Sequence, residues 1–247
     1  MVVQRDREAV AVAHLSNIPE ISLVVPLLNE AENIGTFLDS LSNLRSPKVE
    51  IIFVDGGSTD STVSQLQAFV QNHSNSILLN TDIGRARQMN HGAKAAMGKV
   101  LLFLHGDTLL PLNFFDEVGA LNKSSRVWGR FDVRFNNPML GFSVIAWFMN
   151  VRSKLTGIAT GDQAIFVRRE VFQEIGGFAD QFLMEDVELS SNLKRHSRPL
   201  CIKLPVLTSA RKWEQEGIIK TILLMWRLRI AYKFGQSPQE LVKRYYS

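Results

Sequence analysis

The sequence contains little cysteine and no long uninterrupted apolar run. Its 247 residues include one cysteine, Cys201, so no disulfide can form within the chain, as is typical of proteins from reducing compartments. No window of about 20 residues is both predominantly apolar and free of charged side chains, which argues against a membrane-spanning helix. The opening stretch, MVVQRDREAVAVAHL, mixes acids with bases and lacks the long apolar core of a signal peptide. We therefore expect a cytoplasmic protein.

Two common phosphate-binding signatures are absent as well. The chain has no GxxxxGK[ST] sequence, and DGGSTD at residues 55–60 lacks the spacing of GxGxxG. These absences argue against a P-loop and against a dinucleotide-binding fingerprint. A nucleotide bound by this chain would therefore have its phosphates neutralised by a metal ion and by arginine side chains.

The composition is that of an ordinary globular protein, with 45% apolar and 21% charged residues, but the charge is unevenly spread. Residues 194–247 contain 12 Lys and Arg against 3 Glu, a balance of +9, whereas the rest of the chain has 16 bases and 21 acids, a balance of −5. A basic C-terminal segment is typical of a protein that binds an anionic partner or an anionic surface. It is equally typical of a helix whose basic face is in contact with water. We expect no nucleic-acid partner.

The first 110 residues alternate between short apolar runs and stretches with helical periodicity. The apolar runs, which are typical of buried strands, lie at residues 21–25, 49–54, 77–79 and 100–104. We expect Pro26 to end the first strand and Asp60 to cap the helix after the second strand. This β-α-β-α-β-α-β order predicts a parallel sheet with right-handed crossovers.

The second half has a different pattern. Strands are expected at residues 127–135, 163–168 and 200–207, and helices at 171–175, 185–196, 218–234 and 238–246. No repeat or linker cuts the chain into independent domains. The expected organisation is an N-terminal extension, one α/β domain, and a C-terminal helical segment packed on or beside it, over residues 1–20, 21–210 and 211–247.

An acid follows the end of each of three expected strands: Asp55, Asp82 and Asp107. In a parallel sheet these ends lie along one rim, where open α/β sheets bind their ligands. Each acid alone is explained by a solvated loop or a helix cap. Three carboxylates at one rim repel one another unless a cation or a donor-rich ligand is bound, so the group favours a ligand site.

Several pieces of sequence between residues 20 and 207 occur in a characteristic order: VVPLLNEAENI, IIFVDGGSTDST, GRARQMNHGAKAA, VLLFLHGDT, GGF and MEDVELSSNLKR. In order and spacing they resemble the family 2 glycosyltransferases, and the combination is far more specific than any single piece. The stretches WGRFDVRF, GDQAIFVRRE and TSARKWE resemble a bacterial subgroup of that family. The resemblance implies the GT-A fold for residues 21–210: a mostly parallel central sheet flanked by helices, followed by C-terminal amphipathic helices.

The resemblance also implies roles for individual residues. The residues implied to bind the nucleotide sugar, a UDP- or GDP-sugar, are Pro26, Asn29, Glu30, Asp55, Asp82, Arg85 and Arg87. Asp55 and Asp82 would hold the base and the ribose. Asp107 matches the second acid of the metal-binding DxD motif, which implies a divalent cation, and Asp186 matches the general base.

The first position of DxD is His105 here, within HGDT. An imidazole ligates Mn²⁺, whereas Mg²⁺ prefers oxygen ligands. Alternatively, His105 hydrogen-bonds the ribose or the loop. We therefore expect His105 and Asp107 to ligate the divalent ion together, unless His105 makes this hydrogen bond instead.

Further residues are candidates for contacting the sugar or the acceptor: Trp128, Asp162, Gln163, Glu185, Arg211 and Trp213. Each has a structural alternative, because turns favour polar residues, the first turn of a helix favours acids, and tryptophan commonly packs in or beside a core. Arg211 and Trp213 loosely resemble the RW element of processive members. The full QxxRW is absent, which argues against processive polymer synthesis.

These features predict an inverting glycosyltransferase. The hydroxyl of an unknown acceptor would attack the sugar in a single displacement, with Asp186 accepting its proton. A divalent ion on Asp107, with Arg85 or Arg87, would neutralise the leaving diphosphate. One alternative is a non-catalytic sugar-nucleotide-binding or scaffold protein. A less favoured one is a sugar-nucleotide nucleotidyltransferase, which needs a glycine-rich loop near the first strand, whereas the first glycine here is Gly35.

The helix expected at residues 218–234 combines an apolar stripe with the cationic residues Lys220, Arg227, Arg229 and Lys233. Such a helix fits a membrane interface. Alternatively, its stripe packs on the sheet and its bases face water. With the apolar stretch at 140–149, the first interpretation predicts a peripheral protein at the inner face of an anionic membrane, with a lipid or lipid-linked acceptor. The oligomeric state is not predicted.

Overall fold

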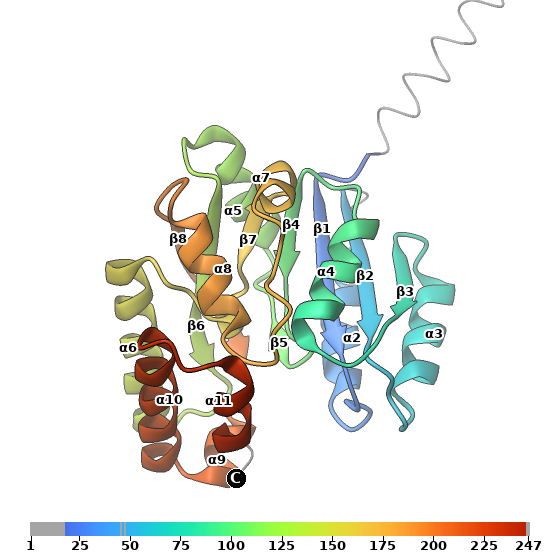
Figure 1. The fold of residues 1–247 in the computed structure, drawn as a ribbon. Coiled ribbons are helices and arrows are strands. Elements are labelled where there is room, and N and C mark those ends of the chain that lie inside the picture. Colours follow the sequence, from blue (N-terminus) through green and yellow to red (C-terminus); the bar gives the residue numbers. More distant parts are fainter. Residues whose placement is uncertain (1–17, 45, 47, 246–247) are drawn as a thin grey trace, which may run out of the picture.

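The computed structural model describes residues 18–44, 46 and 48–245. The extension expected at residues 1–20 lies, up to residue 17, outside the described residues. An eight-stranded sheet has the order β3-β2-β1-β4-β7-β6-β8-β5, and helices cover both of its faces (Figure 1). The sheet and the C-terminal helices are therefore both present, whereas the N-terminal extension stays a prediction.

The first half forms the predicted parallel sheet. Its strands are β1 (Ile21–Leu27), β2 (Val49–Asp55), β3 (Ser76–Asn80) and β4 (Val100–Phe103). They are connected by the helices α2 (Ile34–Ser42), α3 (Thr62–Asn72) and α4 (Arg85–Ala95). The pairs β3–β2, β2–β1 and β1–β4 are all parallel, which confirms the alternating order predicted for the first 110 residues.

Two local expectations were wrong. Pro26 does not end β1, which continues to Leu27. The last residue of β4 pairs with Val24, so Pro26 lies beyond the β4 ladder and its missing N–H costs no bond on that side. Asp60 is not the N-cap of α3, since that position belongs to Ser61. Instead, the Asp60 carboxylate accepts the backbone N–H groups of Thr62 and Ala31 and thereby joins two loops.

The second half adds an antiparallel strand to the parallel part. The strand expected at 163–168 is confined to β7 (Phe166–Arg168), which runs antiparallel to β4 and to β6 (Trp128–Phe135). β8 (Leu200–Thr208) pairs parallel with β6. The helices of this half are α6 (Leu140–Thr156), α7 (Arg169–Glu174) and α8 (Glu185–Leu193). Because β7 is reversed, the loop that precedes it lies at the edge where β4 ends.

Several short elements were not predicted: β5 (Thr108–Leu109), α5 (Phe114–Gly119), α9 (Arg211–Glu216), and the 3₁₀ turns η1 (Ala120–Lys123) and η2 (Gly161–Gln163). Each has six residues or fewer, too few for a hydrophobic period to be recognised. The chain ends with α10 (Ile218–Lys233) and α11 (Pro238–Tyr245). Within the described residues, no helix is both long and apolar enough to cross a membrane.

The core has two layers, one on each face of the sheet. Alternate residues of β1 point to opposite faces, so Leu23 and Val25 pack in the layer shared with α2 and α6, and Val24 packs in the layer shared with α4. α4 lies very close to the sheet at Gly92, where a Cβ atom would come within 2.5 Å of Val24. This close approach explains a glycine inside a helix, despite its low helical propensity.

Candidate active site

The candidate site lies at the rim where β1, β2, β3 and β4 end. β6 and β8 run in the same direction as β4, so their C-terminal ends reach this rim as well. Asp55 is the last residue of β2, Asp82 follows the end of β3, and Asp107 follows the end of β4. The strand directions confirm that these three acids share one rim.

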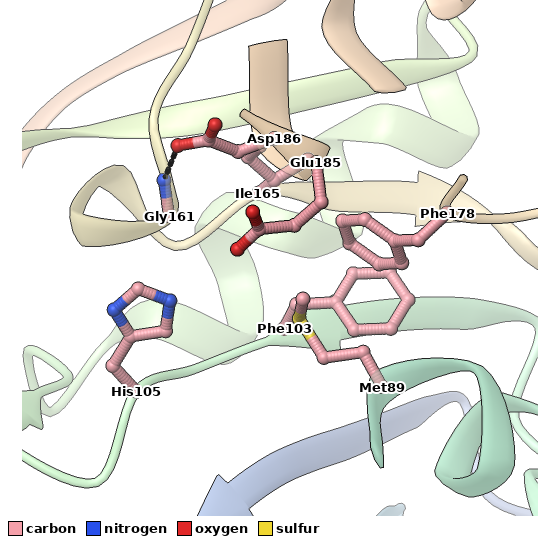
Figure 2. A pocket seen from close by; sticks show the side chains of 8 residues that line it. All are labelled: Met89, Phe103, His105, Gly161, Ile165, Phe178, Glu185 and Asp186. Atoms are coloured by element: carbon pink, nitrogen blue, oxygen red, sulfur yellow. Dashed lines mark hydrogen bonds between the residues drawn. The ribbon is translucent and has the colours of Figure 1, made fainter. Parts of the chain in front are cut away.

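Asp186 lies in the first turn of α8 and faces the loop that enters β7. Its Oδ2 accepts the backbone N–H of Gly161 at 2.9 Å (Figure 2). Its Oδ1 accepts the N–H of Val187 at 2.7 Å. Burial, followed by the negative charge of Glu185, raises the pKa of Asp186 to about 6, although the two backbone donors lower it. A carboxylate whose pKa lies near neutrality is suited to accept a proton.

Glu185 points in a different direction from Asp186, into a small cavity (Figure 2). The cavity encloses about 10 Å³, room for one water molecule. Its lining residues are Met89, Phe103, His105, Gly161, Ile165, Phe178, Glu185 and Asp186. An oxygen of Glu185 lies 3.7 Å from Nη1 of Arg85. Burial would lower the pKa of Arg85, but the charges of Glu185, Asp162 and Asp186 raise it overall, so Arg85 is a permanent cation among these acids.

His105 and Asp162 contact each other beside this cavity. The Nδ1 of His105 lies 3.5 Å from Oδ1 of Asp162. Burial acts to raise the pKa of Asp162, but the hydrogen bond and charge of His105, with the charges of Arg85 and Arg152, bring it below its ordinary value. His105 thus contacts the loop before β7. This contact agrees with the alternative in which His105 binds a loop rather than a metal ion.

Gly161 allows this arrangement, because a Cβ atom built there would lie 2.4 Å from the His105 ring. The backbone of the same residue holds Asp186. The turn η2 therefore connects the loop after β4 to the candidate base on α8.

Asp107 lies close enough to Glu30 for its charge to act there, and Glu30 in turn contacts Arg211. The Asp107 Oδ1 accepts the Thr108 hydroxyl at 3.2 Å. Burial, opposed by the charge of Arg211 and supported by that of Asp107, raises the pKa of Glu30, and Arg211 Nη2 lies 3.5 Å from Glu30 Oε2. Among the described residues, no group of three or more His, Cys, Asp or Glu is placed to hold a metal. A divalent ion on Asp107 would need further oxygen ligands from the substrate, as Mg²⁺ commonly takes from phosphates.

The loops after β1 and β2 are joined through their polar side chains. The buried carboxylate of Asp55 accepts the backbone N–H groups of Gly57 at 2.8 Å and Ser58 at 2.9 Å. Asn29, at a positive φ of 52°, accepts the N–H of Thr59 at 2.8 Å. Pro26 lies just before, inside β1. These bonds make a preformed cradle at the end of the rim formed by β1 and β2.

Arg87 lies apart from the acid cluster. Its Nε lies 2.8 Å from Oδ1 of Asp180, and its guanidinium lies 5.7 Å from the Phe182 ring centroid. The hydrogen bond and charge of Asp180 raise the pKa of Arg87. Of the two arginines predicted to face the diphosphate, Arg85 thus lies among the acids, and Arg87 contacts the loop before α8. Asp82 is exposed and lies close enough for its negative charge to help raise the pKa of Arg87.

Two candidates for sugar contact were wrong. Trp128 is 0% exposed at the opposite end of β6 from the rim, and its indole N–H donates to the Ser197 carbonyl at 2.9 Å. Gln163 is also fully buried, and its amide donates to the Ser153 hydroxyl at 3.0 Å. Both side chains serve packing, which was the stated alternative for the tryptophan. Trp213 is half-buried and packs edge-on against Phe135 with ring centroids 5.8 Å apart.

Three residues near the site were not predicted. Gly161 contributes a backbone donor, which no sequence pattern signals. Gln88 donates from one amide nitrogen to the carbonyls of Leu27 at 2.7 Å and Val54 at 2.8 Å, and so fixes the ends of β1 and β2. Arg152 is a base within the apolar helix α6. Its Nε and Nη2 are buried without a hydrogen-bond partner in the described part of the chain, and burial lowers its pKa.

A mixed sheet of this order, with acids along the rim of its first four strands, defines the GT-A-like class of nucleotide-sugar-binding folds. The profile described as "Glycosyl transferase family 2" matches residues 22–176. This match spans more than half of the chain, which therefore belongs to glycosyltransferase family 2.

Solved structures support the fold. A mannosyltransferase from Pyrobaculum calidifontis, in complex with GDP-Man and Mn²⁺, has a TM-score of 0.64 and 23% identity, covering 86% of this chain and 61% of that one. Residues 1–349 of TarS from S. aureus, in complex with UDP, give a TM-score of 0.63 and 18% identity, covering 77% of this chain and 60% of that one. At these identities the likeness establishes a GT-A-like fold.

Curated relatives include a poly-beta-1,6-N-acetyl-D-glucosamine synthase from Staphylococcus epidermidis. It is 25% identical over 215 residues, which cover 79% of this chain and 52% of the synthase. A PGL/p-HBAD biosynthesis glycosyltransferase from Mycobacterium tuberculosis is 31% identical over 169 residues, covering 65% of this chain and 63% of the relative. The chain thus spans about half the length of the first relative.

Proposed function

We propose that this chain transfers a glycosyl group from a nucleotide-diphosphate sugar to an acceptor hydroxyl, with inversion at the anomeric carbon. The observation that carries this proposal is the position of Asp186: a carboxylate with a pKa of about 6, held by the Gly161 backbone at the rim where Asp55 and Asp107 lie. Family 2 membership and relatives with bound UDP or GDP-Man support a UDP- or GDP-sugar donor.

In the proposed mechanism, the acceptor hydroxyl attacks the anomeric carbon from the face opposite the leaving diphosphate. Asp186 accepts the proton of this hydroxyl, and the glycosidic bond to the diphosphate breaks in the same displacement. Arg85 stabilises negative charge at the centre of the acid cluster, since it stays cationic at all working pH values. One displacement with one base inverts the configuration.

The donor set at Asp107 fits a divalent ion, Mn²⁺ or Mg²⁺. The Asp107 carboxylate is partly exposed at the rim, with Glu30 close by, and a hard cation is commonly held by one or two carboxylates together with phosphate oxygens. When bound, such an ion offsets the charge that develops on the leaving diphosphate. Asp55 and Asn29 would hold the nucleoside in the cradle formed by their loops.

The rim also bears on the two alternative functions. A sugar-nucleotide nucleotidyltransferase would need a glycine-rich loop after β1, but the loop here, residues 28–33, contains no glycine. A non-catalytic binding protein has no need for a base with a pKa near neutrality. Asp162, Glu185 and Arg211 stay candidates for contacts to the sugar or acceptor, because all three lie at this rim.

The test of this function uses the full chain with a panel of nucleotide sugars and Mn²⁺. We expect UDP- or GDP-sugars to raise the melting temperature and to release free UDP or GDP slowly by hydrolysis in the absence of an acceptor. Binding without any release would support the non-catalytic alternative. Release of pyrophosphate from a nucleoside triphosphate and a sugar phosphate would support the nucleotidyltransferase.

Replacing Gly161 by alanine is expected to reduce transfer by up to about 100-fold, because the new methyl group would displace the His105 ring and the donor to Asp186. The matched control is Gly119→Ala, where a Cβ atom would meet nothing within 4 Å. Steady-state rates and melting temperatures of both variants show whether Gly161→Ala lowers the rate of transfer without unfolding the protein. Equal rates in the two variants would contradict a positioning role for Gly161.

A further inference from the structure

An apolar stripe of α10 faces away from the protein core. Its exposed side chains recur every three or four residues and are Ile219, Leu223, Trp226, Ile230 and Phe234, the last just past the helix end. Trp226 is 66% exposed and Phe234 is 84% exposed. Only the opposite side of the helix packs inward, at residues such as Ile218, Ile222 and Leu228. The alternative interpretation, in which the stripe packs on the sheet, is therefore wrong for these side chains.

α6 carries a second exposed apolar stripe. Its members are Leu140, Val144, Trp147, Phe148 and Leu155. The Trp147 and Phe148 rings contact each other edge to face, with centroids 4.9 Å apart. The buried side of α6 contributes Phe142, Ile145 and Ala146 to the core. Both helices are thus apolar on two sides, although only one side of each packs against the protein.

The two stripes belong to neighbouring helices at one end of the molecule (Figure 1). A Cβ atom on Gly141 of α6 would lie 3.3 Å from the Ile218 side chain of α10. Ile218 and Ile222 join the same core layer as α6. An exposed apolar region of this extent, on two adjacent helices, is unusual for a monomer and is typical of an interaction site.

The charge of these helices selects the partner. Neither α6 nor α10 contains an Asp or Glu, and the exposed bases on them are Lys154, Lys220, Arg227 and Lys233. Tryptophan beside lysine and arginine is the composition of helices that lie at a membrane interface, with the rings at headgroup depth. A second copy of this chain would bring like charges together, whereas anionic headgroups are attracted to them.

We propose that the exposed stripes of α6 and α10 form a docking surface for an anionic phospholipid membrane. The helices lie on the bilayer, and their aromatic side chains enter the headgroup region while the bases contact lipid phosphates. α10 also contacts α8, since the Tyr232 hydroxyl donates to Glu188 at 2.7 Å. Docking therefore leaves α10 between the membrane and α8, the helix that carries Asp186, and it does not depend on the proposed transfer reaction.

The experiment is co-sedimentation of the full chain with vesicles of phosphatidylglycerol or of phosphatidylcholine, at low and high salt. We expect binding to the anionic vesicles that weakens with salt, because exposed charges are screened. Neutralising two bases by Arg227→Gln with Lys233→Gln should weaken binding about 30-fold, at about 1 kcal/mol for each base. Replacing Trp226 and Phe234 by serine should weaken it by about 10-fold or more.

Matched controls lie elsewhere on the surface. Lys94→Gln with Lys99→Gln removes the same charge from exposed positions on and just after α4, and Met97→Ser removes a side chain that is 58% exposed. These variants should bind as the parent chain does. The proposal is overturned if the parent chain does not pellet with anionic vesicles at low salt. It is also overturned if all variants bind the vesicles equally. A third contradicting result would be a dimer, seen by sedimentation velocity, that does not bind vesicles and that Trp226→Ser dissociates.

Discussion

Replacing Asp186 by asparagine is expected to lower the rate of sugar transfer by about 10²- to 10⁴-fold, the range for loss of a general base. The amide keeps an oxygen that can accept the Gly161 N–H, but it cannot take the proton of the acceptor hydroxyl. Nucleotide affinity should stay within a factor of about two, since Asp186 lies away from the cradle formed by Asp55 and Asn29. Single-turnover rates and nucleotide titrations measure the two effects separately.

The pH dependence gives an independent check on the same residue. Transfer in the parent enzyme should fall about tenfold per pH unit below pH 6, because the protonated Asp186 cannot accept a proton. Asp39→Asn, at an exposed site on α2, is the matched control and should keep the parent rate and profile. If Asp186→Asn abolished nucleotide binding while turnover at saturating donor survived, Asp186 would be a binding residue and the mechanism would be wrong.

The same raised pKa predicts a change in stability. The pKa of Asp186 is about 6 in the folded chain and about 3.9 in an unfolded one, so between these values the folded state binds more protons. The contribution of Asp186 to the free energy of unfolding therefore falls as pH rises through this window. Asp186→Asn should lose this pH dependence, because asparagine does not titrate, while it gives up one of the two backbone hydrogen bonds. Urea unfolding of both proteins at pH 4.5 and pH 7 measures the difference and separates lost chemistry from lost fold.

Replacing Asp107 by asparagine is expected to reduce transfer by about 100-fold, because it removes the charged ligand proposed for the divalent ion. The fold should be unaffected, since Asp107 is partly exposed and the hydrogen bond that its carboxylate accepts from the Thr108 hydroxyl suits an amide oxygen equally. Turnover at saturating donor, titrated with Mn²⁺ and with a chelator, is the measurement. The variant should also need more Mn²⁺ to reach half of its own maximal rate.

Asp116→Asn is the control for Asp107, because Asp116 is an exposed acid on α5, away from the rim. It should keep the Mn²⁺ dependence of the parent. Unchanged turnover in Asp107→Asn, with and without chelator, would exclude Asp107 as the metal ligand. A variant of His105, such as His105→Gln, then separates metal ligation from its contact with Asp162, since only ligation would alter the Mn²⁺ requirement.

The parts of the fold that the sequence predicted correctly rest on short, nearly continuous apolar runs. β1, β2 and β4 are continuous buried segments whose length and turn residues specify strands, and the helices between them require parallel pairing. The reversal at β7 was not predictable in this way. It is a strand of three residues, and its direction depends on its place between β4 and β6 rather than on its own side chains.

The positions of the three acids along the rim were predicted better than the side-chain contacts made across the rim. Asp55, Asp82 and Asp107 follow strands that could be recognised, so their common edge followed from topology. Trp128 was wrong because residue type alone does not tell which end of a strand carries a ligand. The contact of His105 with Asp162 joins residues far apart in the chain, and the Gly161 donor is a backbone group; neither leaves a local signal.

The position of β7 also has a consequence for how the protein folds. β6 precedes β7 in the chain, yet β7 lies between β6 and β4, so β6 cannot reach its final place until a later segment has arrived. Pairings of high sequence separation form slowly, and β4 pairs with β7 through Val100 and Arg168, whereas β1 pairs with β2 through the much closer Ile21 and Val49. The cradle of Asp55 and Asn29, which we propose holds the nucleoside, belongs to the early part, and Gly161 and Asp186 belong to the late part. A chain arrested between these stages would hold a nucleotide sugar and leave it intact.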